Sequence, residues 1–181
     1  AQVSLRERGR FLKSNEDFLQ ATAEGRWFRS VPLQSVIAWR AQAGVIFELG
    51  AAGGVPNVER FFAGGLNSMR GWALDALGPK NAEGEPIGGL SRAEMTVEIR
   101  TRVLSFLGTA LFLDVGNVGQ NLGAFQPRGL KWSVGAGVRY LSPIGPVRLA
   151  VGYRLSEDDT LNPLVQGIGR VKYHLSLGQA F

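Results

Sequence analysis

Residues 91–103 read SRAEMTVEIRTRV, and apolar and polar side chains alternate along most of this stretch. Apolar residues fill the odd positions from Ala93 to Ile99, whereas the even positions from Arg92 to Arg102 carry a charge or, at one place, a threonine hydroxyl. Successive side chains of a β-strand point to opposite faces of the sheet. This period of two therefore predicts a strand with one apolar face and one charged face.

The same alternation recurs on both sides of this stretch. It is strong in residues 35–50, 108–118, 131–141, 146–155 and 170–181, and weaker in 18–29. Turn-forming residues separate these segments. The sequence thus predicts seven antiparallel strands, or eight if the first dozen residues form one, with a single long connection at 51–88.

Alternating strands of this kind fit two classes of barrel. In a soluble barrel, such as a lipocalin-type one, the apolar face turns to the core, and in an outer-membrane barrel it turns to lipid. Strands of ten or more residues favour the membrane, because about 9–11 residues are needed to cross a bilayer at a tilt. Aromatic residues on the apolar face, several of them near strand ends, favour it too. These aromatics are Trp39, Trp132, Tyr140, Tyr153, Tyr173 and the last residue, Phe181.

The composition excludes several kinds of site. The 181 residues include no cysteine and a single histidine, so we predict no disulfide, no cysteine-bound zinc and no histidine cluster. The formal charge is +5, but Lys and Arg are spread along the alternating segments, and we predict no nucleic-acid partner. We find no nucleophile–base set, metal cluster or phosphate-binding loop, and therefore predict neither an enzyme nor a cofactor.

No segment resembles a membrane helix or a signal peptide. The apolar runs fall well short of the ~20 residues that a membrane helix requires. The first ten residues, AQVSLRERGR, lack the apolar stretch of a signal peptide, so we expect a mature end or a cut end.

One part of the long connection, RFFAGGLNSMRGW at 60–72, fits neither a helix nor a regular strand. It resembles the loop motif F-x-G-G-x-x-S-x-R-G-[FYW] of outer-membrane assembly barrels of the BamA and TamA type, the bacterial surface antigen superfamily. Later segments, from EMTVEIR through LFLDVGN to the terminal SLGQAF, follow in that family's order. The spacing from LGP to EGEPIGG favours the TamA-like branch. The matching motif residues are Phe62, Gly64, Gly65, Ser68, Arg70, Gly71 and Trp72.

The resemblance implies an all-β fold, an antiparallel transmembrane β-barrel of sixteen strands that follows periplasmic POTRA domains. Residues 1–181 would then form the C-terminal part of one barrel domain, with about its last seven or eight strands. The N-terminal strands and the POTRA domains would lie outside this chain. A half barrel would expose two long unpaired edges, so the resemblance requires further strands from elsewhere.

By the same resemblance, the long connection folds back into the barrel lumen, where Arg70 meets Glu98 and Asp114 on the following strands. Alternation independently places both acids on the charged face. A guanidinium group offers a planar fork of donors that suits carboxylates. The motif glycines would let the backbone turn and approach the barrel wall, while Trp72 and Phe62 would pack the loop.

The resemblance also gives the last strand a role. In this family the first and last strands pair weakly, and the seam between them can open so that a client strand adds to the exposed edge by β-augmentation. Glycines in the last strand would weaken it, or would be small residues under a crowded lumen wall. The predicted seam residues are Gly167, Gly169, Tyr173, Leu175, Leu177, Gly178 and Phe181.

The function so implied is that of a non-enzymatic assembly or translocation factor, integral to the bacterial outer membrane. It would insert or export β-barrel or autotransporter-type clients. It would contact outer-membrane lipid or lipopolysaccharide and periplasmic or inner-membrane accessory proteins. A passive transport or export pore of the same superfamily is an alternative, although a porin needs no anchored arginine. A soluble ligand-binding barrel is a second alternative.

Overall fold

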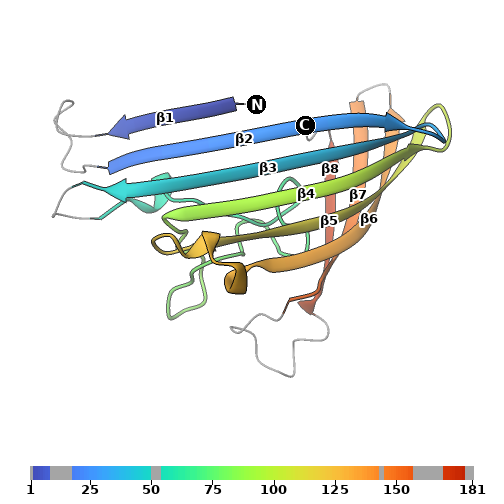
Figure 1. The fold of residues 1–181 in the computed structure, drawn as a ribbon. Coiled ribbons are helices and arrows are strands. Elements are labelled where there is room, and N and C mark those ends of the chain that lie inside the picture. Colours follow the sequence, from blue (N-terminus) through green and yellow to red (C-terminus); the bar gives the residue numbers. More distant parts are fainter. Residues whose placement is uncertain (1, 9–17, 50–53, 143–144, 157–168, 178–181) are drawn as a thin grey trace.

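The computed structural model describes residues 2–8, 18–49, 54–142, 145–156 and 169–177, and its strands form one antiparallel sheet. The eight strands are β1 (Gln2–Arg8), β2 (Phe18–Val31), β3 (Ser35–Glu48), β4 (Ser91–Arg102), β5 (Leu107–Gly119), β6 (Lys131–Ser142), β7 (Gly145–Arg154) and β8 (Val171–Leu177). Each strand pairs with the next one in the chain. The sheet is strongly curved, so that β7 and β8 run across the direction of β2 and β3 (Figure 1).

The predicted all-β antiparallel fold is confirmed, and the eighth strand lies in the first dozen residues. Strands β2 to β7 are 10–14 residues long, as crossing a bilayer at a tilt requires. β2 extends to Val31, beyond the predicted weak segment, because its ladder with β3 continues to the reversal at 32–34. There Leu33 and Gln34 adopt positive φ angles, which turn the chain back sharply.

The register keeps the two faces of the sheet chemically distinct. Residues directly opposite each other on neighbouring strands share a face, and Ile37, Ile99 and Leu111 form one apolar row across β3, β4 and β5. This face is open, with Ile99 46% and Leu111 63% exposed. On the other face Glu98 and Asp114 are 1% and 0% exposed. The sheet thus presents apolar side chains outward and covers its charged ones, the reverse of a soluble protein.

Aromatic side chains lie at two levels of the exposed face. Trp132 and Tyr140 are eight positions apart on β6, about 26 Å along the strand. At a tilt of about 40° they would be about 20 Å apart across the bilayer, close to the separation of the aromatic girdles of outer-membrane barrels. Of the predicted aromatics, Trp132, Tyr140, Tyr153 and Tyr173 are exposed, Trp39 is half-buried opposite Trp27, and Phe181 lies outside the described residues.

The two ends of the sheet differ in their connections. One end, here termed the short-turn end, is compact because its connections are short. They are residues 32–34, residues 103–106 and the reversal at which Ser142 pairs directly with Gly145. The opposite end carries the connection at 120–130, with the 3-10 helices η3 (Gly123–Phe125) and η4 (Pro127–Gly129), and the long connection at 49–90. Outer-membrane barrels have short periplasmic turns and longer extracellular loops. We therefore expect the short-turn end to face the periplasm.

The long connection packs against the charged face of the sheet. It contains the 3-10 helix η2 (Asn57–Glu59) and contributes most members of one buried apolar cluster. The cluster consists of Val55, Phe61, Ala63, Met69, Trp72 and Leu77 of the connection with Phe18, Ile46 and Val118 of the sheet. In the described part of the chain, no helix is long and apolar enough to cross a membrane.

The exposed apolar face predicts a strong effect of charge at its centre. Leu111 lies opposite Ala136, midway between Trp132 and Tyr140 on the neighbouring strand. We expect Leu111→Arg to lower the unfolding free energy in phospholipid vesicles by about 2–4 kcal/mol, the cost of an arginine near the bilayer midplane. Val58→Arg is the control, because Val58 is 88% exposed in the long connection and should tolerate a charge. Equal, small effects in denaturant titrations of both variants would show that the face does not contact lipid.

Candidate functional site

The segment 60–72 forms a compact loop within the long connection. Two isolated bridges, Phe61 with Gly89 and Ala63 with Leu77, pair the outgoing and returning chain at its base. Gly64 then turns the backbone at φ +118°, where a Cβ atom would lie 2.2 Å from the carbonyl oxygen of Ala73. The loop closes through a hydrogen bond from the amide of Gly65 to the carbonyl of Trp72, 3.1 Å. The backbone therefore needs glycine at its entry.

Ser68 fastens this loop to the sheet. Its hydroxyl accepts a hydrogen bond from the amide of Gly64 at 3.0 Å and donates one to Glu94 Oε2 of β4 at 2.8 Å. Next to it, Arg40 of β3 donates through Nη1 to the carbonyl of Asn67 at 2.7 Å. The predicted motif serine thus shapes the loop and also connects it to the charged face.

Arg70 lies at the centre of the charged face and is 6% exposed. Its Nε and Nη2 atoms donate to the two oxygens of Asp114 on β5 at 3.0 and 2.6 Å, in a bidentate pair. Its Nη1 atom donates to Glu98 Oε2 on β4 at 2.7 Å. The structure thus brings together the three residues that the sequence analysis assigned to the site. The guanidinium also lies 3.3 Å from the centroid of the Phe112 ring, close enough for a cation–π contact.

Both carboxylates have further partners. Glu98 Oε1 accepts from Arg100 Nε at 2.8 Å and from Arg139 Nη2 at 2.6 Å, so three arginines surround this acid. Asp114 Oδ1 accepts in addition from Thr96 at 3.1 Å. Burial by itself would lower the pKa of Arg70, but the hydrogen bonds and charges of Asp114 and then Glu98 outweigh it and raise that pKa above its ordinary value. The cluster is therefore a buried network of ion pairs.

The backbone around Arg70 is held as tightly as its side chain. The amide of Arg70 donates to Asp114 Oδ2 at 3.0 Å, and the amide of Gly71 donates to Ser133 Oγ at 3.2 Å. The carbonyl of Arg70 accepts from His174 Nε2 of β8 at 2.9 Å. This contact needs Gly152 of β7, where a Cβ atom would lie 2.1 Å from that carbonyl oxygen.

The two residues that flank the Arg70–Gly71 pair anchor the loop in the apolar cluster. Met69 and Trp72 are 1% and 2% exposed, and both belong to that cluster. Arg154 of β7 covers the Trp72 ring, with its guanidinium carbon 4.6 Å from the ring centroid. One short peptide thus combines ionic, main-chain and apolar contacts, and it touches every strand from β3 to β8.

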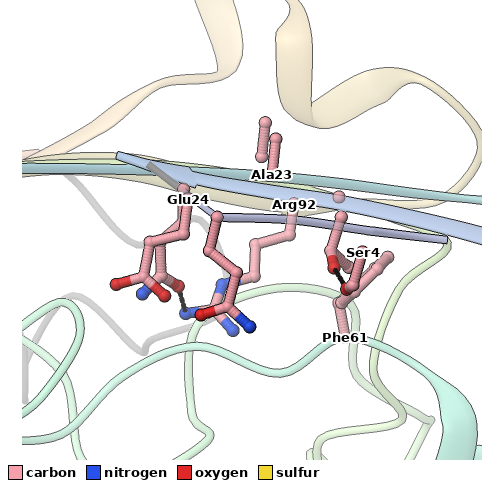
Figure 2. A pocket seen from close by; sticks show the side chains of 10 residues that line it. Ser4, Ala23, Glu24, Phe61 and Arg92 are labelled. Atoms are coloured by element: carbon pink, nitrogen blue, oxygen red, sulfur yellow. Dashed lines mark hydrogen bonds between the residues drawn. The ribbon is translucent and has the colours of Figure 1, made fainter. Parts of the chain in front are cut away.

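A polar cavity of about 230 Å³ lies beside the loop, on the charged face of β1 to β4. Ser4, Glu24 and Arg92 reach into it from the sheet and Phe61 from the connection (Figure 2). Arg92 donates to Glu94 Oε1 at 2.6 Å and also to Gln42, so its charge is compensated within the sheet. Among the described residues, no group of three or more acidic or histidine side chains could hold a metal ion.

The structure differs from the expectation for two of the predicted packing and seam residues. Phe61, not Phe62, faces the sheet, since a Cβ atom on Gly44 of β3 would lie 2.5 Å from its ring, whereas Phe62 packs against Gly88 in the returning chain. Gly169 lies two residues before β8 and not within it, and its weakening or kinking of the last strand stays a prediction.

The remaining predicted seam residues divide into two groups. Tyr173, Leu175 and Leu177 are more than 70% exposed on the apolar face of β8. Gly167, Gly178 and Phe181 lie outside the described residues.

Among the partners of the loop that were missed from sequence are Ser133, His174, Phe112 and Gly152. Period-two counting places all four on the same face as Asp114, and that was the available signal. A single sequence does not give the register that sets them side by side.

The fold and the site can be compared with known proteins. The family model for the Omp85 superfamily domain matches residues 1–181. The outer membrane protein assembly factor BamA of Nitratidesulfovibrio vulgaris is 33% identical over 171 residues, which is 92% of this chain and 21% of that protein. BamA of Neorickettsia risticii is 36% identical over 151 residues, 77% of this chain and 20% of that protein.

The crystal structure of BamA from Haemophilus ducreyi lacking POTRA domains 1–3 has the same fold, with a TM-score of 0.69 and 19% identity over 91% of this chain and 34% of that one. The chain spans about a fifth of the length of the BamA relatives that it matches. All of these proteins are named BamA, and the preference for the TamA-like branch stays a prediction. The match over its whole length shows that the chain belongs to the Omp85 superfamily, as part of an integral β-barrel protein of the bacterial outer membrane.

Proposed function

We propose that this chain is the C-terminal part of the barrel of an outer-membrane assembly or translocation factor that acts on β-barrel or autotransporter-type clients without enzymatic chemistry. The observation that carries the proposal is the buried loop at 60–72, whose Arg70 is held by Glu98 and Asp114. The names of the BamA relatives support it. A passive pore would gain nothing from a loop fixed by so many separate contacts.

In this proposal, Arg70, Glu98 and Asp114 form a latch that keeps the long connection inside the lumen. The remaining strands and the periplasmic domains would precede this chain in the whole protein. Both edge strands of the described sheet, β1 and β8, would then pair with strands outside this chain. Outer-membrane lipid or lipopolysaccharide and periplasmic or inner-membrane accessory proteins would complete the set of partners.

In the described part of the chain, one direct hydrogen bond joins the latch to the proposed seam strand. His174 lies on β8, and its Nε2–H group donates a hydrogen bond to the Arg70 carbonyl, which links β8 to the loop. With the imidazole in its neutral tautomer, neither the donor nor the acceptor of this bond carries a charge. A rearrangement of β8 that moves His174 would remove the partner of a buried carbonyl. We therefore infer that the pairing of the last strand and the position of the loop are coupled.

The latch predicts a selective loss in Arg70 variants. Among the described residues, Arg70→Ala would leave Asp114 with no cationic partner, while Glu98 would keep Arg100 and Arg139. We expect a loss of about 3–5 kcal/mol in unfolding free energy, typical of breaking a buried ion pair, and a loss of client assembly in proteoliposomes. Adding Asp114→Asn should restore part of the stability, whereas adding Glu98→Gln should not. Arg128→Ala, at an exposed arginine, is the control.

Two outcomes would contradict this proposal in different ways. Wild-type stability of Arg70→Ala would show that the latch does not hold the fold. Normal client assembly by a destabilised Arg70→Ala protein would show that the latch is structural only.

The His174 contact predicts a change confined to the loop and β8. His174→Ala should leave the Arg70 carbonyl unpaired and cost about 1–3 kcal/mol, as for other buried groups that lose their partner. Hydrogen–deuterium exchange should rise at residues 64–72 and 171–177 together. His174→Gln, which retains a donor, should restore much of the protection. A rise in hydrogen–deuterium exchange in β8 alone would contradict the proposed coupling.

The proposed seam predicts that a covalent closure stops assembly. A cysteine in place of Leu175 of β8, combined with one on the first strand of the whole barrel, should abolish client insertion when oxidised and restore it when reduced. Either single-cysteine variant should stay active under both conditions. Full activity of the oxidised double variant would exclude opening at β8.

A further inference from the structure

A row of arginines crosses the charged face at the short-turn end. The ladder registers place five inward positions directly opposite one another from β4 to β8: Arg102, Gly108, Arg139, Arg148 and Ser176. The three arginines therefore project from the same level of the sheet. The two remaining positions are small and leave the space around the guanidinium groups open.

Among the described residues, this row carries more positive charge than the neighbouring side chains neutralise. Like charges directly opposite each other destabilise a β-ladder, and Arg139 and Arg148 are such a pair. Glu98 accepts from Arg139, but the same carboxylate also holds Arg70 and Arg100. Within the described residues, Glu98 is the one acid that forms an ion pair with a member of this row, Arg139, and Arg102 has no ion pair. The row is therefore a basic surface with one shared counter-charge.

Arg148 is the most unusual member of the row, because it is 6% exposed and has no carboxylate partner in the described part of the chain. Its Nη2 atom is 3.5 Å from Asn67 Oδ1 and 3.4 Å from Ser176 Oγ, both long for hydrogen bonds and both neutral. Its Nε atom is buried and has no hydrogen-bond partner among the described residues. A buried guanidinium in this condition calls for an anion or water that completes its coordination.

A cavity large enough for a ligand adjoins the row. It has a volume of about 590 Å³, within the range of small-molecule sites. Arg100, Arg102 and Arg139 line it together with Leu104, Leu107 and Leu141. A second, small cavity of about 20 Å³, sufficient for one water molecule, lies between Arg139 and Arg148. Arg139 therefore lines both the larger cavity and the space beside Arg148, whose Nε atom has no hydrogen-bond partner among the described residues.

We propose that this row is a binding site for a phosphate-type anion, taken from solution or from the headgroup of a phospholipid. The planar fork of arginine matches the geometry of phosphate oxygens. Basic pockets beside apolar side chains suit anionic lipid headgroups, and the three leucines supply that apolar side. The expected periplasmic orientation of the short-turn end places the site near the inner leaflet of the outer membrane. The site does not depend on the assembly role.

The test uses the full-length protein that contains this chain, folded in an uncharged detergent. Sodium phosphate is titrated calorimetrically at constant ionic strength against chloride. We expect saturable binding, weakened about tenfold, the effect of one lost charged contact, in Arg102→Gln and in Arg148→Gln. Arg148→Lys, which keeps the charge but loses the fork, should bind at an intermediate level. Arg92→Gln is the control, because Arg92 faces inward at the other end of β4 and is paired.

A second arm separates the two sources of phosphate. The protein is reconstituted in vesicles of phosphatidylethanolamine alone or with phosphatidylglycerol, and retained lipid is identified by native mass spectrometry. Retained phosphatidylglycerol that free phosphate displaces would assign the site to a lipid headgroup. Phosphate binding without retained lipid would assign it to a soluble anion.

Two results would overturn the proposal. One is the absence of both saturable phosphate binding and retained lipid in the folded wild-type protein. The other is an equal loss of binding in Arg92→Gln, which would show unspecific attraction to a basic lumen. Unheated electrophoretic mobility and circular dichroism verify that each variant is folded, and Arg148→Lys keeps the test valid if Arg148→Gln does not fold.

Discussion

Asp114 has no solvent exposure, and a carboxylate in that position needs positive charge beside it. Arg70 supplies three of its hydrogen bonds, two from the guanidinium and one from the backbone amide. The other contacts of the loop follow from this placement. With Arg70 fixed, Gly71 meets Ser133 and the Arg70 carbonyl meets His174. Met69 and Trp72 turn into the apolar cluster. The glycines at 64 and 152 allow the close approaches that this geometry requires.

The curved sheet is suited to this arrangement because its charged face is the protected one. Many of its arginines and acids compensate one another, as in the group that Glu98 forms with Arg70, Arg100 and Arg139. Its apolar face has no such constraint and needs only to be hydrophobic and of the right height. The requirement for particular residues at particular positions therefore applies to the charged face, where each side chain needs a specific partner, and not to the apolar face.

The sequence predicted the strand architecture well, but it predicted the residues of the site only in part. Period-two alternation located the strands and separated Glu98 and Asp114 from Ile99 and Leu111, because a strand reverses its facing at each residue. The pairing of Arg70 with both acids came from resemblance to a family, not from spacing. The loop has no period, so alternation could not decide between Phe61 and Phe62 as the ring that meets Gly44. The alignment of Arg139 with Arg148, and of His174 with the loop, depends on register, which turns and close approaches set and a single sequence does not display.

The position of the loop in the chain has a consequence for how the protein folds. Arg70 precedes β4 to β8, and its contact with His174 joins residues 104 positions apart. Apart from β3 and β4, which the long connection separates, neighbouring strands such as β4, β5 and β6 can pair through contacts close in sequence. The loop, however, has no complete binding surface until the last of these strands is in place. Docking of Arg70 must therefore be a late, long-range event with a high loop-closure cost. A chain whose strands are inserted but whose loop remains undocked would be a discrete intermediate, and burial of Trp72 would mark its conversion to the native state.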